Sequence, residues 1–290
     1  MTKLRAFGIL SVFMLVTIVL LPLQWIAVKL RLPARRSLPH RYHRFVCRLF
    51  GIRIAVIGEP ISGGVLIAAN HTGWLDIPIL SAVAPVSFVS KSEVNQWPFF
   101  GTLARMQRTI FIRRARAKAL NDRNNIRRRL LEGDALVIFP EGTSSDGNRV
   151  LPFRSALFSA AEMSLGEDQS HRAIHAPVQP VSAAYIGLHG MPMGRETRPF
   201  FAWYGDMELV PHLWESLETG PIDVVVEFHR ALTVDEAGGR KALAARCEAA
   251  VRTGLIRALS GSRAGAVPVQ QDEALIEALG DAEAEAGEAA

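Results

Sequence analysis

The chain has 290 residues, of which 49% are apolar, and it carries a formal net charge of +5. This length allows one large domain or two small ones, and the apolar fraction is at the upper end for a soluble protein. Cys47 and Cys247 are the only cysteines, which argues against a disulfide-stabilised secreted protein and suits a reducing compartment.

The N-terminus combines a hydrophobic segment with a basic flank. Phe7–Val28 contains no charge and is long enough to cross a hydrocarbon core of ~30 Å. Arg31, Arg35 and Arg36 follow where a signal peptide would have small residues, which favours a retained membrane helix over a cleaved peptide. Because of Pro22, a re-entrant or interfacial helix remains open. The basic flank predicts a cytoplasmic remainder and suits an anionic membrane surface better than nucleic acid.

The next segment, Pro39–Phe50, has the pattern of an amphipathic helix. Phe45 and Leu49 can share one side of this helix, with Arg44 and Arg48 toward the other. Such a helix packs on the domain surface or lies in the membrane interface, and the pattern leaves both interpretations open.

Short apolar runs then alternate with helical stretches up to about residue 232. The clearest helical stretches are Ala115–Glu132 and Arg154–Ser164, and a late helix is predicted over Val234–Leu259. The alternation predicts an α/β fold with a largely parallel sheet flanked by helices. The predicted strands are Ile52–Ile57, Val65–Ala69, Val86–Ser90, Thr109–Ile112, Ala135–Phe139, Val178–Tyr185 and Asp223–Phe228.

We therefore expect three regions. Residues 1–38 form the membrane helix with its basic flank, and residues 39–260 form the α/β domain. Residues 261–290 are small, polar and acidic, which predicts a disordered tail.

The apolar run Val65–Ala69 ends abruptly in turn-forming residues that are followed by a histidine and an aspartate. In one unbroken helix, His71 and Asp76 would point about 140° apart, so they meet only if the chain turns between them. Gly73 permits such a turn, because glycine adopts backbone angles closed to other residues. The carboxylate would hold the imidazole in one tautomer, and the other ring nitrogen could take a proton from a hydroxyl.

A second buried run, Ala135–Phe139, leads into a turn that carries Glu141. Because ligands bind beyond the carboxyl ends of parallel strands, we expect Glu141 on the same rim as His71 and Asp76. The backbone amides of residues 142–144 can receive an anion there. From the pattern alone, Glu141 is equally well explained as a turn carboxylate that caps a helix or pairs with an arginine.

Basic residues follow a further predicted strand. Arg113 and Arg114 stand at its end, where arginines make a good clamp for phosphate or carboxylate. The alternative is a solvated, basic helix start. The sequence contains no G-x-S-x-G elbow, P-loop or dinucleotide fingerprint, so it lacks the usual signs of serine hydrolases, P-loop enzymes and dinucleotide-binding proteins.

Four blocks of residues together resemble the signature blocks of the glycerolipid acyltransferase family, which includes the 1-acylglycerol-3-phosphate acyltransferases. The resemblance covers roughly residues 40–230, behind the membrane segment, and leaves the tail outside. The blocks are, in order, Asn70-His71-(four residues)-Asp76, Pro98-Phe99-Phe100-Gly101 with Phe111-Ile112-Arg113-Arg114, Phe139-Pro140-Glu141-Gly142-Thr143, and Val178-Gln179-Pro180-Val181.

The resemblance implies that His71 is a general base for a lipid hydroxyl and that Asp76 orients it. The hydroxyl would attack the carbonyl of an acyl thioester, carried by acyl carrier protein or coenzyme A, with no acyl-enzyme, no metal and no further cofactor. Trp74, Trp97, Phe99 and Phe100 can line an acyl groove, although aromatic residues at such spacing are more often core. The residues expected to bind substrate are Arg113, Arg114, Glu141, Gly142 and Thr143.

One departure from the family pattern concerns the acceptor. Members that acylate glycerophosphate usually carry an arginine after Glu-Gly-Thr that holds the acceptor phosphate, whereas here Ser144 and Ser145 follow. Loss of that cation weakens a phosphate site, although Arg113 or Arg114 can compensate. Residues 141–154 resemble the bacterial branch that acylates lyso-ornithine lipid, whose headgroup is an amino acid without phosphate. We therefore expect a lyso-ornithine lipid acceptor at a bacterial inner membrane, with 1-acyl-sn-glycerol-3-phosphate as the alternative.

Two other functions remain open. A lipid-binding or scaffold protein without activity needs only the basic membrane segment, but the intact His71, Asp76 and Glu141 argue against it. A thioester or lysophospholipid hydrolase would use the same histidine with water. Release of free fatty acid that is independent of an acceptor would distinguish this hydrolase from the transferase.

Overall fold

The computed structural model describes residues 2–112, 119–167, 171, 173–261 and 267–268. Arg113, Arg114 and most of the acidic tail therefore lie outside the described residues.

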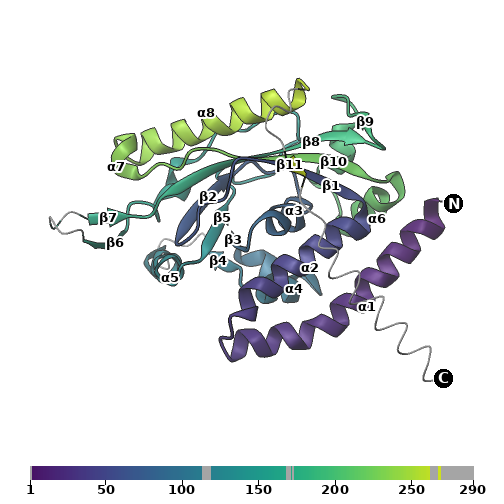
Figure 1. The fold of residues 1–290 in the computed structure, drawn as a ribbon, viewed down its shortest axis with the longest axis horizontal. Coiled ribbons are helices and arrows are strands. Elements are labelled where there is room, and N and C mark those ends of the chain that lie inside the picture. Colours follow the sequence, from purple (N-terminus) through teal and green to yellow (C-terminus); the bar gives the residue numbers. More distant parts are fainter. Residues whose placement is uncertain (1, 113–118, 168–170, 172, 262–266, 269–290) are drawn as a thin grey trace.

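A nine-stranded, mostly parallel sheet forms the centre of the molecule (Figure 1). Its order is β11-β1-β10-β8-β2-β5-β3-β4, with β9 beside β8, and the largely parallel sheet predicted from the sequence is confirmed. β8 runs antiparallel to β10. The strands are β1 Ile52–Ile57, β2 Val65–Ala69, β3 Val86–Lys91, β4 Ile110–Ile112, β5 Ala135–Ile138, β8 Val178–Leu188, β9 Met191–Pro192, β10 Ile222–Phe228 and β11 Val267–Pro268, and the separate hairpin of β6 Ser164–Glu167 and β7 Ala173–His175.

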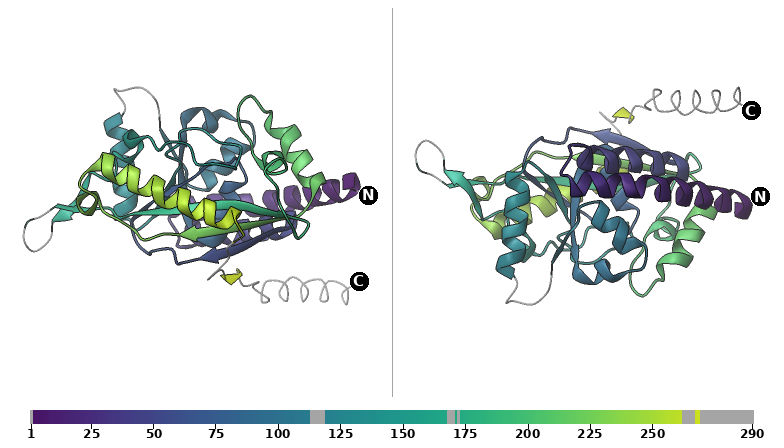
Figure 2. Two further views of the ribbon diagram at one scale, coloured as in Figure 1. Left: turned by 90° about the horizontal axis from the view of Figure 1, so that it is seen from above. Right: turned by 90° about the horizontal axis from the view of Figure 1, so that it is seen from below.

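Helices cover both faces of the sheet (Figures 1 and 2). α7 and α8 lie over one face, while α1, α2 and α3 lie over the other, and each face has its own apolar core. The helices are α1 Thr2–Lys29, α2 Ala34–Phe50, α3 Asp76–Val83, α4 Phe100–Met106, α5 Ala119–Leu131, α6 Leu209–Thr219, α7 Val234–Ala237 and α8 Arg240–Leu259, with short 3-10 helices at Ser92–Gln96, Ser155–Phe158 and Arg198–Phe201.

The N-terminal helix α1 lies alongside α2 and against the α/β domain (Figure 2). Among the described residues it is the one helix long and apolar enough to cross a membrane. Phe13, Thr17 and Gln24 on its inner face are buried, whereas the outer face is exposed and apolar. Phe13 packs in the main core, and Gln24 Nε2 donates hydrogen bonds to the carbonyls of Arg35 and Met106. The exposed side chains are Leu4, Phe7, Val12, Leu15, Ile18, Val19, Leu23, Trp25 and Ile26.

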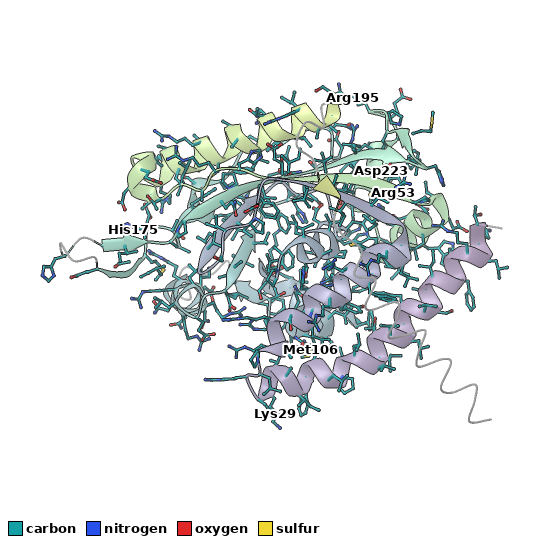
Figure 3. All side chains as sticks on the ribbon, viewed as in Figure 1. Lys29, Arg53, Met106, His175, Arg195 and Asp223 are labelled. Carbon is teal, nitrogen blue, oxygen red and sulfur yellow. The ribbon has the colours of Figure 1, made fainter. Side chains whose placement is uncertain are left out.

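An ion pair joins the neighbouring strands β1 and β10 near their N-terminal ends. Arg53 of β1 and Asp223 of β10 stand opposite one another in the strand register, and Arg53 Nε donates to Asp223 Oδ1 at 2.6 Å (Figure 3). Cys47 and Cys247 are both buried as free thiols, in the two different cores, so they do not form a disulfide.

One helix prediction was wrong, and a second missed a break within the helix. The predicted helix Arg154–Ser164 is only a 3-10 turn over Ser155–Phe158. Phe158, Ala160 and Ala161 are all buried, and no single helix face presents these three positions, so tertiary packing overrides helix propensity. The late helix is broken into α7 and α8 at Gly238 and Gly239, whose φ angles are +85° and +109°.

The limits of two other segments also differ from expectation. α2 begins at Ala34, ahead of the predicted start, and it accommodates Pro39 within its length. In the predicted tail, Val267–Pro268 pairs antiparallel with β1, while residues 262–266 and 269–290 lie outside the described residues.

Candidate active site

The strands β2 and β5 bring the two predicted catalytic turns together. They are neighbouring parallel strands, with Val65 opposite Ala135 and Ala68 opposite Ile138. Their carboxyl ends therefore meet at one edge of the sheet, as expected for an α/β ligand site. The backbone amide of His71 donates to Glu141 Oε1 at 3.4 Å, so the predicted common rim is confirmed.

The chain turns between His71 and Asp76, as the sequence predicts. Asp76 N donates to the carbonyl of Gly73 at 3.2 Å, and α3 begins at Asp76. The sequence analysis expects Gly73 because glycine adopts backbone angles that are closed to other residues, but Gly73 does not have a positive φ. A Cβ at this position would lie 2.7 Å from the backbone nitrogen of Trp203, so close approach of two backbone segments requires the glycine.

The Asp76 carboxylate is fully buried and accepts four hydrogen bonds. Its Oδ2 faces His71 Nδ1 at 2.7 Å and accepts from the amides of Thr72 and Gly73 at 2.7 and 3.0 Å. Tyr185 of β8 donates its hydroxyl to Oδ1 at 2.8 Å. A buried charge is tolerated only when it is paired and hydrogen-bonded, and these donors meet that condition. The arrangement fixes both the position and the Nδ1–H tautomer of the imidazole.

The imidazole ring is held from a second side by an aromatic residue. Phe139 stacks on His71 with ring centroids 4.0 Å apart and ring planes 16° from parallel. The His71 side chain remains 22% exposed, against 0% for Asp76. In the described part of the chain, Nε2 makes no hydrogen bond, so this nitrogen is available to an incoming hydroxyl.

Glu141 is an unusual carboxyl group on the same rim. Burial is the main cause that raises the pKa of Glu141 to about 8; the hydrogen bond from the His71 amide opposes this shift, and the nearby Asp76 carboxylate adds to it. Oε2 is buried, and no described residue donates a hydrogen bond to it. The raised pKa favours the protonated form of Glu141 at neutral pH.

The loop 140–154 closes around this rim. Arg154 N donates to the carbonyl of Pro140 at 2.9 Å, and Ser145 N donates to the carbonyl of His71 at 2.8 Å. The Gly142 amide is occupied by the Phe139 carbonyl within the turn. Among the described residues, the amides of 143 and 144 make no backbone hydrogen bond, so they remain available to an anion.

An apolar cavity of about 280 Å³ opens beside His71. Helix α1 forms one wall from Phe13 to Gln24, a length of about 16 Å at 1.5 Å per residue. Of the four aromatic residues expected along an acyl groove, Trp74, Trp97 and Phe100 line the cavity, whereas Phe99 packs against the main core and is not among the lining residues. The remaining wall residues include Leu20, Leu21, Tyr42, Val46, Phe50, Ile77, Phe88, Leu103, Met106, Trp203 and Leu213.

Several residues at the site were not identified from the sequence. Tyr185 and Phe139 hold the catalytic pair directly, and Asn70 bonds the backbone of Ala183 through both its amide atoms, at 2.8 and 2.9 Å. Asn70 and Phe139 both stand in signature blocks that give them no role, although a polar residue such as Asn70 at the end of a fully apolar strand is a usable signal. The predicted Arg113 and Arg114 lie outside the described residues. In the described ranges, no group of three or more His, Cys, Asp or Glu side chains could hold a metal ion.

Comparison with known proteins identifies the family. The profile of the acyltransferase family matches residues 53–184. Lyso-ornithine lipid O-acyltransferase of Brucella abortus is 46% identical over 89% of this chain and 96% of its own length, and that of Rhizobium meliloti is 44% identical over 78% and 77%. A 1-acyl-sn-glycerol-3-phosphate acyltransferase of Neisseria gonorrhoeae is 33% identical over 68% of this chain and 72% of its own length.

A solved structure shares the fold. The crystal structure of the 1-acyl-sn-glycerophosphate acyltransferase from Thermotoga maritima matches with a TM-score of 0.60 over 89% of this chain and 97% of that chain, at 21% identity. The site and the comparisons point to the same family. The structure pairs His71 with Asp76 beside the Glu-Gly-Thr turn, and the relatives match over most of their own length. The chain is thus an enzyme of the acyltransferase family, as its four signature blocks predicted.

Proposed function

We propose that this acyltransferase moves a fatty acyl group from a thioester to the hydroxyl of a lyso-ornithine lipid. The observation that carries the proposal is the His71 imidazole, which is fixed by Asp76 on Nδ1 and borders the apolar cavity. A proton-accepting group beside a hydrocarbon-lined space is what a reaction between two lipid substrates requires.

The reaction proceeds by general base catalysis. His71 Nε2 takes the proton of the acceptor hydroxyl as its oxygen attacks the thioester carbonyl, and the imidazolium is stabilised by Asp76. When the tetrahedral intermediate collapses, the carbon–sulfur bond breaks and His71 returns the proton to the departing thiolate. The products are the acylated lipid and the free thiol of acyl carrier protein or coenzyme A, without an acyl-enzyme, metal or further cofactor.

The negative oxygen of the intermediate needs hydrogen-bond donors near His71. The Thr72 and Gly73 amides are occupied by Asp76, and the Gly142 amide is occupied within its turn. The amides of Thr143 and Ser144 are the donors that support the proposal, because among the described residues they make no backbone hydrogen bond.

The cavity supplies the site for the fatty acyl chain. It is lined by about 16 Å of α1 at 1.5 Å per residue, which suits a long hydrocarbon chain with its thioester near His71. Burial of the chain against apolar walls contributes about 0.8 kcal/mol per methylene group, which favours fatty acyl donors over short ones.

Two observations support the proposed acceptor: the names of the relatives, and the serine that follows Glu-Gly-Thr in place of an arginine. The two most similar relatives named above are lyso-ornithine lipid O-acyltransferases, and Ser144 stands where a phosphate-holding arginine follows Glu-Gly-Thr in glycerophosphate-acylating members. The second candidate acceptor is 1-acyl-sn-glycerol-3-phosphate, which is favoured by the relative from Neisseria gonorrhoeae.

The enzyme is proposed to work at the cytoplasmic face of a bacterial inner membrane. The inner face of α1 is packed against α2 and the α/β domain, so lipid cannot surround this helix. The exposed apolar face of α1 supports a placement within the membrane surface, with the basic residues of α2 near lipid headgroups.

The proposal is tested with the purified enzyme in mixed micelles. Acyl carrier protein and coenzyme A thioesters are each offered with lyso-ornithine lipid, lysophosphatidic acid or no acceptor. We expect transfer to lyso-ornithine lipid, with His71→Ala reducing the rate about 10²–10⁴-fold. Equal transfer by His71→Ala would refute the mechanism, transfer only to lysophosphatidic acid would refute the acceptor, and fatty acid release without acceptor would indicate a hydrolase.

A further inference from the structure

A single exposed arginine stands beside the Glu141-Gly142 turn without an acidic partner. A Cβ at Gly142 would lie 3.2 Å from Nε and Cζ of Arg154, so the guanidinium covers this turn. Arg154 is exposed, and within the described part of the chain its guanidinium makes no ion pair or hydrogen bond. The neighbouring Arg252 differs, because its charge is compensated by Glu248 at 2.6 Å.

The backbone holds Arg154 at this place. The amide nitrogen of Arg154 donates a hydrogen bond to the carbonyl of Pro140, which joins the two ends of the loop 140–154. Within the same loop, the amide of Ser145 donates to the carbonyl of His71. Phe153 N donates to Glu248 Oε2 on α8, which fixes the preceding residue to a rigid helix. The guanidinium is therefore positioned on the rim of the catalytic turns, although Arg154 is distant from His71 in sequence.

The headgroup of the acceptor must also lie on this rim. The cavity beside His71 is lined mainly by apolar side chains and contains no Lys, Arg, Asp or Glu among the described lining residues, so a charged group loses several kcal/mol of hydration when it enters such a space. When the acceptor hydroxyl reaches His71 Nε2, its charged headgroup therefore stays outside. An ornithine headgroup that is N-acylated on its α-amine presents a free α-carboxylate and a δ-ammonium group.

We infer that Arg154 binds the α-carboxylate of the lyso-ornithine headgroup and so determines acceptor specificity. The inference rests on the proposed function. The planar guanidinium matches a carboxylate with two parallel N–H···O hydrogen bonds, which a lysine cannot reproduce. Arg154 thus takes over, from the far end of the loop, the recognition of an anion that glycerophosphate-acylating members assign to the residue after Glu-Gly-Thr. The bound anion is a carboxylate with one negative charge, which a single unpaired cation balances.

The test compares two acceptors that differ only at the α-carbon: lyso-ornithine lipid and its α-carboxamide. For the wild-type enzyme we expect kcat/KM about 10–100-fold higher with the carboxylate, as a charge-assisted hydrogen bond provides. Arg154→Gln is expected to raise KM for the carboxylate acceptor by a similar factor, to leave kcat within about twofold and to treat both acceptors alike. Arg154→Lys keeps part of the preference, and Arg149→Gln, an exposed arginine of the same loop, keeps all of it.

A purely structural role of Arg154 would lower turnover of both acceptors equally, and that result would overturn the inference. Equal use of the two acceptors by the wild-type enzyme would also overturn it, whether or not any variant folds. If the wild-type enzyme acylates lysophosphatidic acid and neither ornithine acceptor, the proposed function is what fails.

Discussion

The protonated state of Glu141 makes the stability of the protein fall as the pH rises. An unfolded glutamate ionises near 4.5, whereas burial raises the pKa of Glu141 to about 8. Between these values the folded state binds more protons than the unfolded state, so the free energy of unfolding decreases with pH. The stabilisation is complete below 4.5 and is lost as the pH rises to 8. At 1.36 kcal/mol per pH unit, this interval corresponds to about 5 kcal/mol.

The substitution Glu141→Gln isolates this effect, because glutamine stays neutral at every pH. The unfolding free energy of the wild type relative to Glu141→Gln should decrease by about 4 kcal/mol from about pH 5 to about pH 9, a relative shift in melting temperature of roughly 10 °C. Melting curves in detergent at both pH values measure it, and any constant penalty of the glutamine cancels in the comparison. Glu59→Gln, an exposed carboxyl outside the site, is the control. A difference between wild type and Glu141→Gln that does not change with pH would refute the assignment of a neutral Glu141.

Three further substitutions test the geometry around the catalytic pair and the cavity. Tyr185→Phe removes the hydrogen bond to Asp76 Oδ1 and should lower the free energy of unfolding, measured by chemical denaturation, by about 1.5–3 kcal/mol. We also expect a lower kcat at unchanged KM for the donor. An unchanged free energy of unfolding would contradict the role of the hydroxyl. Leu21→Trp fills the cavity and should shift donor preference to shorter acyl chains in a competition assay, whereas Leu23→Trp on the exposed face of α1 should not. Gly73→Ala should reduce transfer activity at least about tenfold, because the added Cβ forces the catalytic turn away from the backbone of Trp203. A wild-type rate for this variant would contradict the close approach of the two backbone segments.

Local patterns in the sequence were sufficient to predict the catalytic pair. His71 and Asp76 lie on one short turn after an apolar strand, so their meeting depends only on local backbone geometry. Glu141 follows a second strand of the same kind, and parallel pairing places both strand ends on one edge. The family resemblance then supplied the reaction, which the composition alone did not identify.

Contacts between distant segments were not predictable in the same way. Tyr185 reaches Asp76 across 109 positions of sequence, and its side chain direction depends on the register of β8 in the sheet. The sequence predicts a helix over Arg154–Ser164, whereas the chain there forms only a 3-10 turn over Ser155–Phe158 and the Arg154 guanidinium lies against Gly142. The depth of the cavity depends on how α1 docks, which no hydropathy pattern specifies.

The docking of α1 means that one helix both presents an exposed apolar face and forms a wall of the cavity beside His71. Phe13, Thr17, Leu21 and Gln24 close the side of the chamber that would otherwise face solvent. A version of the enzyme without α1 would therefore have a cavity that is open to solvent, and the hydrocarbon chain of the donor would stay in contact with water. Removal of α1 should therefore abolish acyl transfer together with any membrane attachment that its exposed apolar face provides.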